Sequence, residues 1–381
     1  MKFLFASDSF KGSLSSGQTA ELLTRAARAV FGDGVECVGV PVADGGEGTA
    51  EAVVEAERGS WIETVVHGPL REPVTARYGR LDEKRAVLEM AAASGLTLIP
   101  AEKRDPLRTT SCGVGELIRH ALEQGFTELA VAIGGSATND GGMGCVRALG
   151  GRFLDEHGRE LEGRGEDLEK VRQIDLSGLD PRLRDAKITV MCDVTNPLCG
   201  PDGATYTFGA QKGAGPEALA RLEAGMVNYR DVIRRQFGAD PDAVPGAGAA
   251  GGLGAALSVF LGGELRSGID TVLDLIGFDR RLEGTDLVVT GEGRTDWQSC
   301  FGKVMQGVGR RARAAGVPAV GLSGSLGRDA AGIYDCGIDS IMTAVDAPMP
   351  LEEAMDRAEE LYYQAAVRMF RLLRTGMKLG R

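Results

Sequence analysis

The sequence predicts an α/β protein of two domains, in which both chain ends form one doubly wound domain and the middle forms a second, inserted α/β domain. The chain has 381 residues, whereas single hydrophobic cores stop growing at roughly 250–300 residues. Short apolar runs alternate with helical patterns, which is typical of βαβ units. The runs near the two ends resemble each other, so we assign residues 1–62 and 270–381 to the first domain and residues 63–269 to the second.

Five apolar runs predict the strands of the first domain. Two lie near the N-terminus and three near the C-terminus: Lys2–Ser7, Val35–Val42, Asp286–Thr290, Pro318–Ser323 and Ser340–Val345. Together they make an ordinary sheet, which two or three strands alone do not. A capping box at residues 15–18 opens the first helix, and an amphipathic pattern from Leu351 to about Leu373 predicts the last. Parallel pairing would place ligands at the carboxyl ends of the strands.

The middle of the chain contains strands and helices of its own. Its strand-like runs are Glu63–His67, Thr75–Leu81, Ala86–Met90, Glu128–Ile133 and Lys187–Met191. Helical periodicity follows Ser111, Pro216 and Leu253. Because two domains imply a cleft between them, we expect the substrate to bind there.

Composition excludes several classes of protein. A net charge of −11 and no basic run argue against nucleic acid as a partner, and no apolar stretch is long enough for a membrane span or signal peptide. The seven cysteines contain no C-x-x-C pair, which argues against a zinc site or a disulfide framework and for a reducing compartment. We therefore expect a cytoplasmic protein with a small-molecule substrate, and keep a homodimer as the expectation for its assembly.

Glycine is about twice as frequent as usual, at 56 residues, and clusters after predicted strands. Glycine there lets backbone N–H groups approach an oxyanion closely. The best phosphate loop follows the run Glu128–Ile133, and its predicted nucleotide-binding residues are Gly134, Gly135, Ser136, Thr138 and Asn139. The alternative is a tight strand-to-helix turn with polar caps.

Acidic residues lie beside these glycines. Mg²⁺ binds one or two carboxylates together with phosphate oxygens, and phosphoryl transfer needs an acceptor that orients the attacking hydroxyl. Asp193 is predicted as the base or a metal ligand and Asp296 as a second metal ligand, while Asp44 and Glu292 are assigned to the substrate. The alternative for any one of them is capping of a helix.

Hydroxyl and basic side chains complete the predicted site. Ser13 is assigned to the substrate, and Lys11 and Arg294 are predicted to neutralise anionic groups, because each lies on a loop at the end of a strand. The alternative for a lone lysine is a solvated surface residue. Asp193→Asn is expected to lower kcat by orders of magnitude while the fold is kept.

Two rival functions come from other classes. Gly246–Gly251 matches G-x-G-x-x-G with Asp270 following, as in nicotinamide-dependent oxidoreductases, but the preceding Asp240–Pro245 is too polar for the required strand. A sensor that binds the small-molecule ligand or a nucleotide without catalysis is the other rival. With three histidines and none of the G-x-S-x-G, H-E-x-x-H or Walker A patterns, a hydrolase or P-loop enzyme is disfavoured.

Seven sequence blocks, in order along nearly the whole chain, resemble the bacterial-type (type 1) D-glycerate kinase family. They are SDSFKGSLS at 7–15, PVADGGEGT at 41–49, EMAAASGL at 89–96, IGGSATNDGG at 133–142, CDVTNP at 192–197, PGAGAAGG at 245–252 and TGEGR at 290–294. The resemblance implies a Rossmann-like domain made from both chain ends, a second α/β domain, and ATP- and Mg²⁺-dependent phosphorylation of D-glycerate. Of the two products, 2-phosphoglycerate is favoured over 3-phosphoglycerate.

Overall fold

The structure, a computed structural model, describes residues 1–379 and divides into two compact units. The terminal unit comprises residues 1–44, 55–57 and 268–381, and the central unit comprises residues 45–54 and 58–267. Both contain parallel β-structure between helices, which confirms the predicted fold class. Within residues 1–379, no helix combines the length and apolar character that crossing a bilayer requires.

The terminal unit is built on a five-stranded, all-parallel sheet. Its strands are β1 (Lys2–Phe5), β2 (Glu36–Gly39), β11 (Leu287–Thr290), β13 (Ala319–Ser323) and β15 (Ser340–Thr343). The spatial order β2-β1-β11-β13-β15 is 2-1-3-4-5 in order of appearance. All five predicted strands are therefore present, and the order reverses between β1 and β11, which makes this point the topological switch of the sheet.

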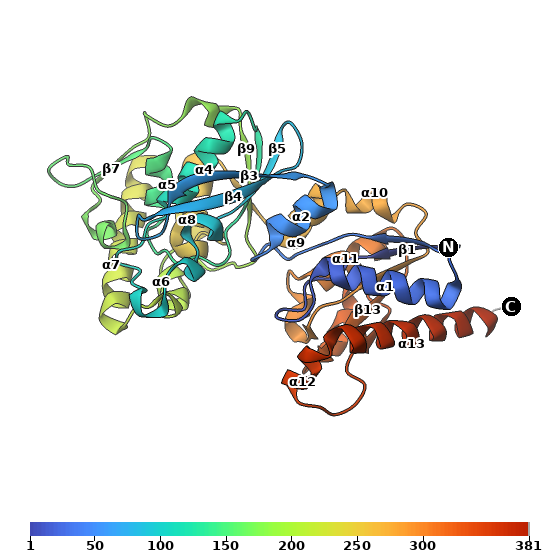
Figure 1. Cartoon of the computed structure of the whole chain (residues 1–381). Helices are drawn as coiled ribbons and strands as arrows, with labels where there is room; N and C mark the ends of the chain where they lie inside the picture. The colour runs from blue at the N-terminus through green and yellow to red at the C-terminus, as the bar shows by residue number, and fades with distance from the viewer. Residues whose placement is uncertain (380–381) are drawn as a thin grey trace. The chain divides into compact units, whose positions relative to one another are not determined.

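Helices cover both faces of this sheet. On one face, α1 (Ser16–Phe31) and α13 (Ala358–Leu379) lie side by side over Phe3 and Phe5 of β1 (Figure 1). Helix α11 (Val304–Ala314) packs on β11 and β13 and contacts α9 (Gly268–Leu275). Ser15 and Gln18 form the predicted capping box of α1.

The C-terminal helix differs from its prediction. Instead of one helix from Leu351, the chain forms α12 (Leu351–Asp356), a turn at Arg357, and α13. No proline or glycine marks this turn, and the amphipathic pattern continues across it, so sequence periodicity could not reveal the break. The short α12 supplies one wall of the pocket described below.

The central unit contains a six-stranded sheet in the order β10-β9-β6-β5-β4-β3. Its strands are β3 (Ser60–His67), β4 (Pro73–Arg80), β5 (Arg85–Glu89), β6 (Glu128–Ala132), β9 (Lys187–Met191) and β10 (Glu264–Arg266). The first four in spatial order are parallel, and β3 and β4 form an antiparallel hairpin. Only β10 was not predicted in this sheet, because three residues of mixed polarity give no periodic signal.

The helices of the central unit enclose one apolar core. The four that bear on the site are α4 (Cys112–Glu123), α5 (Met143–Ala148), α7 (Pro216–Phe237) and α8 (Ala249–Leu261). The other helices and strands of the described chain are α2 (Thr49–Glu57), α3 (Ala91–Ser94), α6 (Ala204–Phe208), α10 (Phe278–Leu282), β7 (Arg152–Leu154), β8 (Gln173–Asp175), β12 (Arg294–Thr295) and β14 (Ser325–Leu326). The 3-10 helices used below are η5 (Ala210–Lys212), η6 (Pro241–Ala243), η7 (Trp297–Cys300) and η8 (Ala330–Cys336).

Candidate active site

A pocket of about 390 Å³ opens at the topological switch of the terminal unit. The loops after β1 and β11 meet there, and the backbone N–H of Asp8 donates to the carbonyl of Gly291 over 2.9 Å. Crevices at such a point, outside the carboxyl ends of parallel strands, are the usual ligand sites of open α/β sheets. The pocket has a polar side and an apolar wall, and the wall includes Leu351, Ala354, Met355, Ala358, Leu361 and Tyr362.

Three carboxyl groups line the polar side of the pocket: Asp8, Asp44 and Glu292. Burial, followed by the negative charge of Asp44, raises the pKa of Asp8 from 3.8 to about 7. Burial also raises the pKa of Glu292, whose Oε1 accepts a hydrogen bond from the Thr295 hydroxyl over 3.2 Å. Acids that resist ionisation in this way are suited to accepting a proton or holding a cation.

Three basic side chains line the same pocket: Lys11, Arg294 and Lys303. The Arg294 side chain is 67% exposed, and its Nε lies 3.7 Å from Oδ2 of Asp296. The positive charges of Lys11 and Lys303 oppose the rise in the pKa of Asp8 and of Glu292, respectively. Because acids and cations face one cavity, a ligand bearing both an anionic group and hydroxyls is the chemistry that fits.

Two further predicted residues, Ser13 and Asp296, lie at or beside the pocket, but their side chains form hydrogen bonds with nearby backbone groups. Ser13 lines the pocket, and its hydroxyl donates to the carbonyl of Phe10 over 3.0 Å. Asp296 caps η7, since its Oδ1 accepts from the Gln298 N–H over 2.9 Å. Capping of a helix N-terminus is the alternative role that the sequence allowed for such acids.

The predicted phosphate loop lies in the central unit, directly after β6. Gly134 and Gly135 are exposed and Ser136 is half-buried. Gly135 has φ of +74°, and a Cβ on Gly134 would lie 3.3 Å from the Cα of Gly46. The loop therefore approaches the glycine-rich segment that begins at Gly45, and small residues on both sides permit this close approach.

The second half of the loop is buried. Thr138 and Asn139 have no exposed surface, and among residues 1–379 neither Thr138 Oγ1 nor Asn139 Oδ1 has a hydrogen-bond partner. Lys212, at the end of η5, is only 2% exposed and donates from Nζ to the Thr138 carbonyl over 2.7 Å. Burial lowers the pKa of Lys212 to about 7, while Asp140 acts in the opposite direction. Only the Gly134–Ser136 part of the loop is thus open to a ligand.

The fully buried Asp140 holds the loop against the N-termini of two helices. Its Oδ2 accepts hydrogen bonds from the backbone N–H and hydroxyl of Ser111, both over 2.7 Å, and its Oδ1 accepts from the Gly142 N–H over 3.0 Å. Gly144 N–H also donates to Oδ2, over 3.2 Å. The N-terminus of α5 is therefore neutralised by the protein's own carboxylate rather than left for a phosphate.

Asp193 follows β9, the neighbour of β6, and is exposed. Since β6 and β9 are parallel and Ala132 pairs with Met191, Asp193 and Gly134 leave the sheet at the same edge. Both residues were predicted as ligand contacts because each follows a strand, and the parallel pairing places the two strand ends at one edge of the sheet.

The G-x-G-x-x-G segment serves packing. The residues before it form η6 rather than a strand, and Ala250, Gly251 and Gly252 have φ of +54°, +66° and +93°. A Cβ on Gly251 would overlap the Thr138 carbonyl oxygen. The segment is thus a tight turn that supports the phosphate loop.

Comparison with known proteins identifies the family. A family model described as the glycerate kinase family matches residues 3–374. This chain belongs to the glycerate kinase family. It is 47% identical to a glycerate kinase of Bacillus subtilis (strain 168) over 96% of both chains, and 47% identical to a glycerate 2-kinase of Escherichia coli (strain K12) over 99% of both. A crystal structure of a putative glycerate kinase 2 from Salmonella typhimurium LT2 covers 99% of both chains with a TM-score of 0.90 and 44% identity.

Within this member of the glycerate kinase family, the sequence did not single out all residues of the pocket. Asp8 and Lys303 carry the right chemistry in the right loops, but their depth in the pocket depends on packing. The apolar wall from α12 and α13 had no sequence signal beyond ordinary amphipathicity. Adjacency to a predicted strand end marked Asp8 as a candidate, but Asp44, Glu292 and Asp193 share this position, so it did not rank Asp8 above them.

Proposed function

We propose that this chain transfers the γ-phosphoryl group of ATP to a hydroxyl of D-glycerate, with 2-phosphoglycerate as the product. The observation that carries the proposal is the pocket at the switch point, in which three acids and three basic side chains face one cavity. Glycerate offers one carboxylate and two hydroxyls, which match such a lining. The name of the E. coli relative, glycerate 2-kinase, supports the choice of product.

In this proposal, Lys11 and Arg294 bind the substrate carboxylate, and Ser13, Asp44 and Glu292 contact its hydroxyls. Arginine presents a planar fork of donors to a carboxylate, and charge-assisted hydrogen bonds contribute about 1.5–3 kcal/mol each. Arg294 is 67% exposed and forms a long ion pair of 3.7 Å with Asp296, so its guanidinium can reach a ligand.

Arg294→Gln and Lys11→Gln should each raise the KM for D-glycerate by roughly 10–100-fold, with a smaller change in kcat, because they remove one charge-assisted contact. Steady-state kinetics with varied glycerate at saturating ATP measures this. Arg25→Gln is the matched control, since Arg25 is an exposed arginine of the same unit paired with Glu359 outside the pocket. An unchanged KM in both pocket variants would remove these residues from substrate binding.

The ATP phosphates are assigned to the exposed part of the glycine loop, Gly134, Gly135 and Ser136. Thr138 and Asn139 are fully buried, so they are proposed to support this exposed part of the loop rather than to contact ATP directly. Backbone N–H groups at such a turn are suited to phosphate oxygens. The protein's contribution to phosphoryl transfer is then positioning and neutralisation of charge.

Asp8 is proposed as the group that accepts the proton of the attacking hydroxyl. A general base works best when its pKa lies near the operating pH, and a pKa of about 7 meets that condition. Asp193, an exposed residue of the central unit, keeps the other role that the sequence suggests, that of a metal ligand.

The donor set also fits Mg²⁺, which takes carboxylate oxygens together with those of phosphates. Asp193 of the central unit is proposed to hold it, with Asp296 of the terminal unit as the other candidate. When bound, Mg²⁺ neutralises negative charge on the transferred phosphoryl group. Asp296 is the weaker of these candidates, because its carboxylate already caps η7 and faces Arg294.

Asp193→Asn should lower kcat by at least tenfold and raise the Mg²⁺ concentration needed for half-maximal rate, with an unchanged melting temperature. A titration of activity against Mg²⁺ measures both effects. Asp202→Asn, at another acid of the loops that follow β9, is the control. Near-normal turnover and Mg²⁺ dependence would exclude Asp193 from the reaction.

One assay tests the whole proposal. ADP release is followed with and without D-glycerate, and the phosphorylated product is assigned by ³¹P NMR in the same tube. Glycerate-dependent ADP release with a secondary phosphate ester is expected. Binding of glycerate without ADP release would instead indicate a sensor, and NADH-induced thermal stabilisation without a response to ATP would indicate an oxidoreductase.

The cytoplasm is the proposed location, since ATP is available there and all seven cysteines are free thiols.

A further inference from the structure

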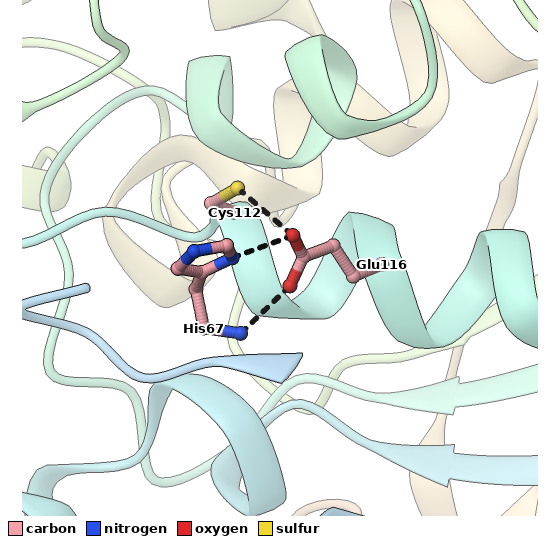
Figure 2. Close-up of side chains that lie close together, drawn as sticks. All are labelled: His67, Cys112 and Glu116. Carbon is pink, nitrogen blue, oxygen red and sulfur yellow. Dashed lines mark hydrogen bonds and ion pairs between the residues drawn. The ribbon is translucent and has the colours of Figure 1, made fainter. Parts of the chain in front are cut away.

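A cluster of three potential metal ligands lies in the central unit, outside the residues assigned to the reaction. It joins His67, the last residue of β3, to Cys112 and Glu116 in the first two turns of α4 (Figure 2). Cys112 and Glu116 are four residues apart and therefore share one helix face. The cluster brings together nitrogen, sulfur and oxygen donors.

The donor atoms converge closely. His67 Nδ1 lies 2.7 Å from Glu116 Oε1, and Cys112 Sγ lies 3.9 Å from the same oxygen. The backbone N–H of His67 donates to Glu116 Oε2 over 2.7 Å, which fixes the carboxylate. One atom from each of the three residues lies within 4.8 Å of the others. Ligands 2.0–2.3 Å from one tetrahedral ion are separated by about 3.3–3.8 Å, so small side-chain movements would admit an ion.

Glycine makes this convergence possible. A Cβ on Gly113 would overlap the carbonyl oxygen of His67, so any other residue there would push the end of β3 away from α4. The close approach places His67 over the helix face that carries the other two ligands. Beside the cluster, a hollow of about 180 Å³ is lined by His67 and Glu116, among others.

We propose that His67, Cys112 and Glu116 form a binding site for one Zn²⁺-like divalent transition-metal ion, with a water molecule in the adjoining hollow as the fourth ligand. Thiolate, imidazole and carboxylate are the ligands that Zn²⁺ takes, and three protein ligands leave one position open. A thiolate and a carboxylate balance the charge of the ion. His67 lies far from the other two ligands in sequence and only one ligand is a cysteine, so the absence of a C-x-x-C pair, which argued against a zinc site, does not bear on this one.

The surroundings define the chemistry of binding. A cysteine binds such an ion as a thiolate, so binding releases the proton of the Cys112 thiol. His120 also lines the hollow, but its Nδ1 pairs with the Tyr78 hydroxyl over 2.9 Å. His67, rather than His120, would therefore supply the imidazole ligand, through its Nδ1.

The ion would act as a clamp within the central unit. It would connect the β3–β4 hairpin to the start of α4, where Ser111, directly before Cys112, holds Asp140 of the phosphate loop. Binding to the folded chain alone raises its stability by mass action. The proposal does not rest on the reaction assigned above.

The test uses the full-length chain after treatment with a chelator and without nucleotide. Co²⁺ serves as a spectroscopic probe, because a cobalt–thiolate bond gives a near-ultraviolet charge-transfer band. Zn²⁺ binding is measured by calorimetry. We expect one ion per chain, a thiolate band with Co²⁺, and a rise in Tm of several degrees with Zn²⁺.

Variants assign the ligands. Cys112→Ser should abolish the band, and His67→Ala and Glu116→Gln should each weaken Zn²⁺ binding by about 100-fold or more. His67 is half exposed, so its variant is informative even if Cys112→Ser does not fold. Cys300→Ser and His157→Ala are the controls and should bind normally; Cys300 interacts with Cys336 and is the alternative thiol site. The proposal is overturned if there is no band, if the band persists in Cys112→Ser, or if it is lost only in Cys300→Ser.

Discussion

Substitution of Asp8 by asparagine is expected to lower kcat by about 10²–10⁴-fold, the usual contribution of a general base, with little change in the KM for ATP. The reason is the position of this carboxyl group, which lies in a pocket with Asp44, Glu292 and Lys11 and has a pKa of about 7. Asparagine keeps the shape of the side chain but cannot accept the proton.

The pH dependence of the wild-type enzyme provides a second measurement. Asp8 must be ionised to act as a base, so kcat/KM should rise with pH and level off above an apparent pKa near 7. In Asp8→Asn this limb should disappear from the residual activity. A wild-type profile that is flat between pH 6 and 8 would contradict the assignment.

The same substitution should stabilise the fold, which separates catalytic loss from misfolding. The pKa of Asp8 is about 7 in the folded chain and 3.8 ordinarily, so the folded chain binds this proton more tightly. The stabilisation of the folded chain by protonated Asp8 is fully present below about pH 4 and is lost as the pH rises through about 7. At pH 8, Asp8→Asn should therefore raise Tm by roughly 1–4 °C. A fall in Tm alongside lost activity would indicate structural damage instead.

The sheet of the terminal unit was predictable because its strands are short apolar runs. All four residues of β11 and all five of β13 are buried, so no polar position interrupts the pattern. Its spatial order was less accessible, since β1 pairs with β11 across most of the chain. Only the rule that sequential βαβ units pair in parallel brings these strands together.

The candidate site was predictable in residue type but not in depth. Lys11, Ser13, Asp44, Glu292 and Arg294 were chosen as strand-end residues, and all five line one pocket. The sequence could not rank Asp8 above Asp193, because burial determines a pKa and is a property of the folded chain. Nor could it separate the exposed Gly134 from the buried Thr138 within one loop.

The largest expected effect on stability belongs to Asp140→Asn. The carboxylate accepts four hydrogen bonds in a fully buried position, and an amide would turn an NH₂ group towards one of these donors. The substitution also removes the negative charge near buried Lys212. We expect a loss of about 2–4 kcal/mol of unfolding free energy, which thermal or urea unfolding would measure.

Asp82→Asn is the matched control, because Asp82 accepts bonds from the Lys84 N–H and from the N–H and Nε of Arg85 but is half exposed. Water can replace those partners, so Asp82→Asn should lower the unfolding free energy by less than about 1 kcal/mol.

A double-mutant cycle of Asp140→Asn with Ser111→Ala should give a coupling of about 0.5–3 kcal/mol, since the two side chains share a hydrogen bond. Equal effects at Asp140 and Asp82, with no coupling to Ser111, would mean that the buried carboxylate does not organise the loop. The KM for ATP should rise together with the loss of stability, because the same four bonds hold the backbone on which Gly134–Ser136 depend.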